Sequence, residues 1–101
     1  MMSSKINALS EKLVSVFNEH GYEPTFVGIL EGRQSHNSIA KKEEVYILKG
    51  KDNKFIFLRK KSYSRDLRRY VLLCNGYEIY RKKCSVRDAA RDLDAILQEY
   101  D

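Results

Sequence analysis

The sequence YVLLCNGYEIY, at residues 70–80, carries the clearest signal of secondary structure in the chain. Residues 70–74 and 77–80 are rich in the aromatic and aliphatic side chains that β-strands favour. Asn75 and Gly76 between them tolerate the two positive φ angles of a type I′ turn, whose backbone twist matches that of two paired strands. The stretch therefore predicts a β-hairpin, which we extend to residues 69–82.

Three further segments, residues 25–30, 45–49 and 54–60, have the composition of strands. The last two are joined by GKDN, residues 50–53, and are predicted to form a second hairpin over residues 45–60. In FIFL, residues 55–58, both alternating faces are apolar. Such a strand is expected at the centre of a sheet that is either covered on both sides or strongly twisted.

Amphipathic helices are predicted at both ends of the chain. Residues 4–20 carry apolar side chains three or four positions apart, with Ser3 or Ser4 as a cap and Gly21 as the terminating residue. Residues 85–99 repeat the pattern, and Ser85 with Asp88 approximates a capping box. The prediction is a single α+β domain over residues 1–101 in the order α-β-β-β-β-β-α, with both helices packed on an antiparallel sheet of about five strands.

Other features of the chain limit the classes of protein to which it can belong. No run of about 18 apolar residues and no signal peptide is present, so we expect a cytoplasmic protein without membrane spans.

The polar residues 31–42 make a long connection, for which a flexible loop is expected and a functional loop is the alternative. Cys84 would lie roughly seven residues beyond the turn that Cys74 flanks, too far for a disulfide, and both thiols are expected to be reduced.

No sequence motif for catalysis, cofactors or metals is recognised. The chain has no phosphate-binding glycine loop, no H-E-x-x-H and no paired C-x-x-C. Ser35 and His36 are neighbours in the polar loop, but a nucleophile and its base need a rigid scaffold and a third group that orients the base. The sequence therefore favours a protein that is not an enzyme, with an unrecognised activity as the alternative, and no cofactor is expected.

Positive charge is concentrated in the middle of the chain. Residues 49–83 contain 12 Lys or Arg and 3 Asp or Glu, whereas the remaining residues contain 7 and 11. If residues 54–60, 69–74 and 77–81 form an antiparallel meander, the end of the first, the start of the second and the end of the third meet at one edge of the sheet. The basic residues that would converge there are Arg59, Lys60, Lys61, Arg65, Arg68, Arg69, Arg81, Lys82 and Lys83, with Ser85 and Arg87 beside them at the start of the last helix.

A cation cluster next to a helix N-terminus favours anions. The phosphates of DNA or RNA suit so many cations, because each contact releases condensed counterions. Tyr63, Tyr70 and Tyr80 lie among these charges and would stack on unpaired bases if they were exposed. The alternative is a solvated strand edge with the tyrosines packed in the sheet.

Two functions are consistent with this pattern. The first is a small basic nucleic-acid-binding accessory or regulatory domain that contacts phosphates through the basic edge. The second is an adaptor or inhibitor that docks the same charges on an acidic surface of a partner protein. A polar loop over residues 31–42 that orders on binding would suit either function.

Ser85-Val86-Arg87-Asp88-Ala89, following strands, resembles the last part of a double-stranded-RNA-binding domain, whose final helix starts with Ser and basic residues ahead of an alanine. The chain departs from that family because it lacks the lysine pair after Ser85 and has more strands. Residues 88–91, DAAR, with Asp94 after three strands are similar to the AP2 DNA-binding domain of plants, which reads DNA with its sheet. Both resemblances imply nucleic-acid binding, and each covers too little of the chain to assign a family.

Overall fold

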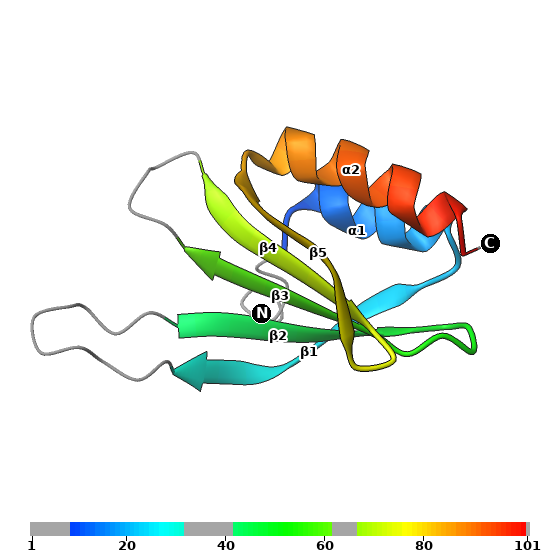
Figure 1. Ribbon diagram of the computed structural model, residues 1–101, viewed down its shortest axis with the longest axis horizontal. Coiled ribbons are helices and arrows are strands. Elements are labelled where there is room, and N and C mark those ends of the chain that lie inside the picture. Colours follow the sequence, from blue (N-terminus) through cyan, green and yellow to red (C-terminus); the bar gives the residue numbers. More distant parts are fainter. Residues whose placement is uncertain (1–8, 32–41, 62–66, 101) are drawn as a thin grey trace, which may run out of the picture.

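The computed structural model describes residues 9–31, 42–61 and 67–100, which form two helices and five strands (Figure 1). In chain order the elements are α1 (Glu11–Glu19), β1 (Glu23–Glu31), β2 (Lys42–Lys49), β3 (Phe55–Lys61), β4 (Arg68–Cys74), β5 (Tyr77–Cys84) and α2 (Val86–Gln98). The predicted α+β class and the order α-β-β-β-β-β-α are confirmed. The predicted flexible loop lies almost wholly outside the described residues.

The five strands form one antiparallel sheet in the order β1-β2-β3-β4-β5, so every strand pairs with its neighbours in sequence. Both predicted hairpins are present. At the turn between β4 and β5, Asn75 has a φ of 52° and Gly76 a φ of 90°, the two positive angles that the Asn-Gly pair was expected to supply. Cys74 and Cys84 are buried free thiols near opposite ends of this hairpin.

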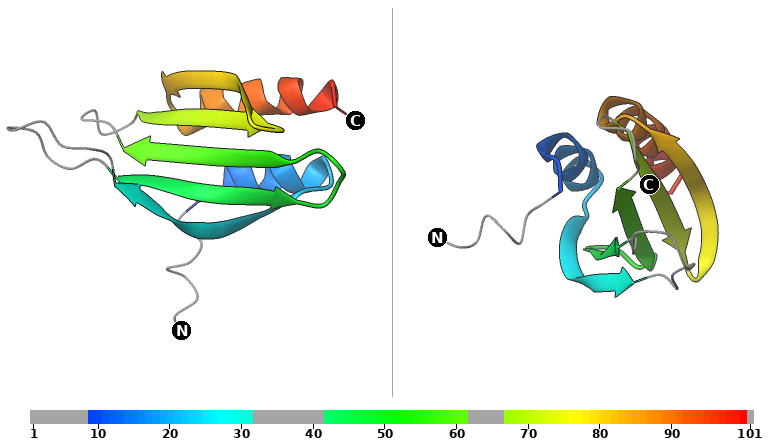
Figure 2. Two further views of the ribbon diagram at one scale, coloured as in Figure 1. Left: turned by 60° about the horizontal axis from the view of Figure 1, so that its bottom comes forward. Right: turned by 90° about the vertical axis from the view of Figure 1, so that its left-hand side faces the viewer.

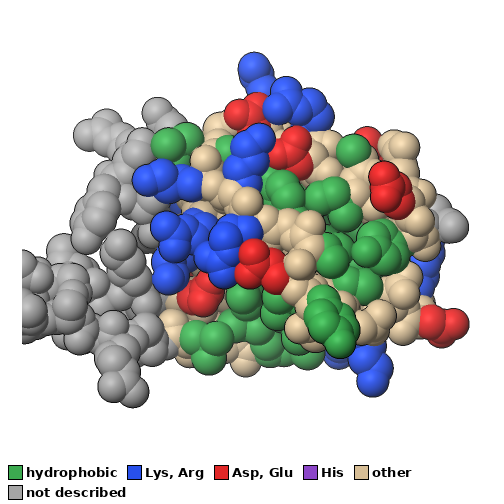
Figure 3. Space-filling model, in the orientation of Figure 1, with side chains coloured by type: hydrophobic (Ala, Val, Ile, Leu, Met, Phe, Trp, Pro, Cys, Tyr) green, Lys and Arg blue, Asp and Glu red, His purple; other side chains and the backbone are tan. Residues whose placement is uncertain are grey.

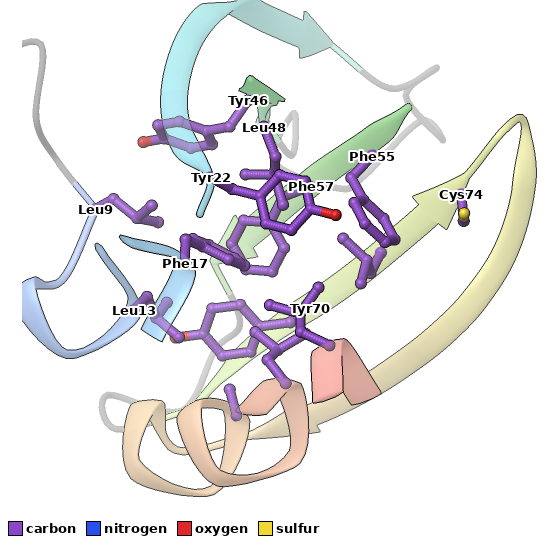
Figure 4. Close-up of a cluster of buried hydrophobic side chains, with 14 of the residues drawn as sticks. Leu9, Leu13, Phe17, Tyr22, Tyr46, Leu48, Phe55, Phe57, Tyr70 and Cys74 are labelled. Carbon is purple, nitrogen blue, oxygen red and sulfur yellow. The ribbon is translucent and has the colours of Figure 1, made fainter. Parts of the chain in front are cut away.

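Both helices pack on the same face of the strongly twisted sheet (Figure 2). The core between them is aromatic: Phe17 of α1 meets Phe57 of β3 edge to face with ring centroids 5.1 Å apart. Leu13 points toward the ring of Tyr70 in the same layer (Figure 4). Of the two arrangements considered for β3, the structure has the twisted sheet, since among the described residues helices cover only one face.

The start of α1 corrects the sequence prediction. A helix over residues 4–20 was expected, but Leu9 and Ser10 are not helical and the helix begins at Glu11. Ser10 takes an extended conformation, and its hydroxyl accepts a hydrogen bond of 3.2 Å from the amide of Lys12. This side chain satisfies a first-turn amide and so serves as the N-cap. The proposed caps Ser3 and Ser4 lie outside the described residues.

A polar contact joins the two helices across their interface. His20, at the C-terminal end of α1 and only 8% exposed, places Nε2 at 2.7 Å from Oδ1 of Asp94 on α2. The contact links segments 74 residues apart in the chain and helps to fix how the helices lie on the sheet. Neither described helix is long and apolar enough to cross a membrane.

Candidate nucleic-acid interface

Strand pairing brings the predicted cations to one end of the sheet. In the register of β3, β4 and β5, Lys61 lies opposite Arg68 and Lys60 opposite Arg69, while Arg69 in turn lies opposite Lys83. We call this the basic end: residues 59–61 of β3, 68–69 of β4, 81–83 of β5 and 85–87 at the start of α2. Arg65 and Tyr63 lie outside the described residues, and only the backbone of Lys61 is described.

Lys60, Arg69 and Lys83 form a single row on the face opposite the helices. Neighbouring strands are about 4.8 Å apart, so three cations here occupy a line about 10 Å long. Arg69 and Lys83 are exposed and Lys60 is partly exposed, and none of the three makes a side-chain ion pair within the described part of the chain. In Figure 3, basic side chains gather at this end of the sheet.

Three other cations of the basic end, Arg59, Arg68 and Arg87, line an open pocket of about 620 Å³ on the helix side of the sheet. Two caps contribute to its wall, Ser10 at the N-terminus of α1 and Ser85 at the N-terminus of α2. Each helix N-terminus carries partial positive charge and unsatisfied amides. The lining residues are Ser10, Arg59, Arg68, Tyr70, Ser85, Val86, Arg87 and Asp88.

The floor of this pocket is organised around a buried tyrosine. Arg59 pairs with Glu44 at 2.6 Å, with its side chain 12% exposed, and Arg68 donates a hydrogen bond of 3.0 Å to the carbonyl of Leu67. Burial raises the pKa of Tyr70, and the nearby charges of Arg59 and Arg68 partly offset that rise. Two arginines therefore lie close to the hydroxyl of Tyr70, and the exposed Arg87 stands at the pocket rim.

Two more of the predicted cations, besides Arg59, are paired with carboxylates of this chain. Arg81 donates two hydrogen bonds of 2.9 Å to Glu78, which lower the pKa of that exposed carboxyl. Lys82 lies 3.1 Å from Asp92 of α2. Burial raises the pKa of Asp92, but hydrogen bonds from Tyr80 and Lys82 outweigh it and the net shift is downward. Phosphate would have to compete with these carboxylates for Arg81 and Lys82.

Two of the three tyrosines predicted to stack on bases, Tyr70 and Tyr80, are packed instead. Tyr70 is 1% exposed and stacks on Phe57 with ring centroids 5.8 Å apart, which corrects the stacking prediction for this residue. Tyr80 is partly buried and donates a hydrogen bond of 2.9 Å to Asp92. The cause in each case is strand alternation, which turns both side chains toward the helices.

Sequence reasoning missed the contribution of Ser10 to this site. Because the first helix was expected to begin near residue 4, its N-terminus was not placed beside the basic end. The available signal was Ser10 followed by Glu11, a capping residue with an acidic residue in the first turn. The structure brings both helix N-termini to one pocket, whereas the sequence predicted only that of the last helix.

Comparison with known proteins finds no family model, no curated protein and no solved structure that matches this chain. Among the described residues, no group of three or more His, Cys, Asp or Glu side chains is placed to hold a metal ion.

Proposed function

We propose that the protein is a cytoplasmic nucleic-acid-binding accessory or regulatory domain that contacts phosphates through the basic end. The observation that carries the proposal is the row of Lys60, Arg69 and Lys83, which are aligned across three strands. Glu43 lies opposite Lys60 in the register, but no ion pair joins any of the three side chains to a carboxylate of the described residues, so they are available to an external anion. Each phosphate they neutralise would release condensed counterions.

The pocket beside the row supports the same function. A nucleic-acid backbone that follows the row can place a further phosphate at the rim, where Arg87 and the first amides of α2 face solvent. Phosphates position a protein on a nucleic acid without reading its sequence. With Tyr70 buried, the proposed contacts are to the backbone rather than to the bases.

The alternative function is that of an adaptor or inhibitor that docks an acidic protein surface on the same charges. The two functions predict different salt dependence. Binding to a nucleic acid releases the counterions condensed along its uniformly charged strand, so log affinity falls linearly with log salt concentration. A protein ligand would also survive treatment with nuclease.

The first prediction concerns the triple variant Lys60→Gln, Arg69→Gln, Lys83→Gln. Fluorescence anisotropy with labelled single- and double-stranded DNA and RNA, at two salt concentrations, measures binding. For three lost contacts on duplex DNA, the slope of log affinity against log salt should become shallower by about 2.7. Affinity at the lower salt concentration should fall correspondingly.

A matched control is Lys12→Gln, Lys49→Gln, Lys54→Gln, which removes the same charge from exposed positions outside the basic end. This variant should keep most of the affinity and nearly the whole salt slope. Equal losses in the two variants would show that net charge alone attracts the nucleic acid. Absence of binding by the unmodified protein at low salt would exclude the proposed function.

A further inference from the structure

The face of the sheet opposite the helices carries a second group of apolar side chains. Strand register places Val45, Leu58 and Val71 in one row across β2, β3 and β4. Ile47, Ile56 and Leu73 form the adjoining row in the same register. We call these six residues the aliphatic face; none of them belongs to the core beneath the helices.

The aliphatic face is preformed and partly open to solvent. Ile47 is 37% exposed, whereas Val71 is 1% exposed although no described helix covers it. The side chains that adjoin Val71 on this face therefore already cover it. Single exposed aliphatic residues are common, but here five partly exposed ones adjoin one another around Val71, and large contiguous apolar patches mark interaction surfaces. Figure 3 shows hydrophobic side chains next to the basic side chains on this side of the molecule.

Charge around the aliphatic face indicates what kind of molecule would cover it. The row of Lys60, Arg69 and Lys83 comes next along the strands, and Arg81 continues the row of Val71. Glu43 and Glu78 are the acidic residues in the same rows, so the border is positive overall. An occupant must therefore present apolar side chains with acidic groups beside them.

Other occupants fit this surface less well. A second copy of the chain would bring the same positive borders together, and like charges at an interface are unfavourable. Nucleic acid would account for the cations but not for the aliphatic rows, because unpaired bases stack on aromatic rings. Tyr77, which is 77% exposed, lies opposite Cys74, on the alternating face that is turned away from the six aliphatic residues.

We propose that the aliphatic face docks an amphipathic helix of a partner protein, with an apolar stripe flanked by Asp and Glu side chains. The helices α1 and α2 already occupy the other face, so the aliphatic face is the side of the sheet on which an external helix would pack. This inference goes beyond nucleic-acid binding at the basic end. It gives an accessory domain a second surface through which it recruits another protein.

The experiment uses the full chain labelled with ¹⁵N and two synthetic amphipathic helical peptides of about 18 residues, five helical turns. The peptides share one apolar stripe, which is flanked by Glu in the first peptide and by Lys in the second. The Glu-flanked peptide should shift amide resonances of β2, β3 and β4 and bind at least about tenfold more tightly than the Lys-flanked peptide at low salt. No shifts with the Glu-flanked peptide, shifts confined to α1 and α2, or equal binding of both peptides would overturn the proposal.

A pair of variants tests the location. Ile47→Thr combined with Ile56→Thr should weaken binding of the Glu-flanked peptide by about tenfold or more, since Thr keeps the branched shape and removes apolar contact. The matched control is Ile29→Thr, which removes an equally apolar, 50% exposed side chain from β1, opposite Glu44 and outside the aliphatic rows. If the double variant does not fold, Ile47→Ser at the most exposed of the six positions replaces it.

Three further outcomes would contradict the proposal. Equal loss of peptide binding in the Ile29→Thr control would mean that the peptide does not bind specifically to the aliphatic face. Sedimentation of the free protein as a dimer that Ile47→Thr with Ile56→Thr dissociates would make a second copy the occupant. Loss of nucleic-acid binding in that double variant would assign the face to nucleic acid. Because the Gln variants at the basic end are measured separately, failure of this inference would leave the proposed function standing, and the reverse also holds.

Discussion

Three tyrosine hydroxyls near the core differ in whether they have a partner. Tyr80 donates to Asp92 at 2.9 Å and Tyr46 donates to Glu44 at 3.2 Å. The hydroxyl of Tyr22 is buried and has no hydrogen-bond partner among the described residues. A buried hydroxyl without a partner costs about 1–3 kcal/mol of desolvation that nothing offsets. The same chemical change at two tyrosines should therefore have opposite effects on stability.

We expect Tyr22→Phe to leave the free energy of unfolding unchanged or to raise it by about 1 kcal/mol, because the variant removes an unsatisfied polar atom. Tyr80→Phe should lower it by about 1 kcal/mol, since Asp92 loses a donor. Urea denaturation of the two variants, followed by circular dichroism, measures both changes. A loss in Tyr22→Phe as large as that in Tyr80→Phe would show that the Tyr22 hydroxyl is hydrogen-bonded.

The sequence predicted where the cations gather but not which of them are paired. Turn positions and strand segments can be read from the local sequence, so they predicted that the basic residues converge at one edge, whereas the row of Lys60, Arg69 and Lys83 follows from the observed register. The partner of Lys82 is on α2, where only tertiary packing brings Asp92 into reach. Arg81 and Glu78 are three residues apart and would face opposite sides of a regular strand, but the register shift in β5 turns both to the same side. Neither effect is visible in the local sequence.

At the scale of elements, β3 and α1 show what periodicity can and cannot decide. The apolar sequence FIFL correctly predicted a central strand, since β3 pairs with β2 and β4. The same sequence could not reveal that helices cover only the face of Phe55 and Phe57. Apolar spacing continued upstream of residue 11, so the pattern alone extended α1 too far, whereas the cap at Ser10 marks its start.

The other cap, Ser85, leads to a prediction about α2. Its hydroxyl accepts a hydrogen bond of 3.2 Å from the amide of Asp88. We expect Ser85→Ala to lower the free energy of unfolding by about 1 kcal/mol, because that amide loses its partner. Ser15→Ala, at an exposed position inside α1, is the control and should change stability by no more than a few tenths of a kcal/mol. Thermal unfolding distinguishes the two, and equal effects would show that Ser85 does not cap α2.

At the scale of the whole molecule, the two faces of one sheet have different roles. The face beneath α1 and α2 holds the aromatic core and, at the basic end, the pocket between two helix N-termini. The opposite face holds the aliphatic rows and the row of Lys60, Arg69 and Lys83. Strand alternation therefore produces both the stability of the fold and the surfaces proposed to bind partners.

The free energy of unfolding should fall at alkaline pH, because the folded chain keeps several buried tyrosines protonated that the unfolded chain would ionise. Burial, together with the adjacent Glu44, raises the pKa of Tyr46 to about 12, and burial also raises the pKa of Tyr70 and of Tyr80. An unfolded chain ionises tyrosine near pH 10. The stabilising effect is therefore complete below pH 10 and is lost as the pH rises toward 12, where the unfolded state releases protons that the folded state retains.

We expect the urea midpoint of unfolding to decrease steeply between about pH 10 and pH 12, with Tyr46 alone accounting for roughly 2–3 kcal/mol at the upper limit. In Tyr46→Phe the decrease should be shallower, because Phe has no proton to lose, even though lysines still titrate in the same range. The difference in phenolate absorbance between the unmodified protein and Tyr46→Phe should appear together with unfolding rather than before it. Ionisation of Tyr46 at pH 10 in a chain that stays folded would show that its hydroxyl is solvated and that the core opens more readily than its packing indicates.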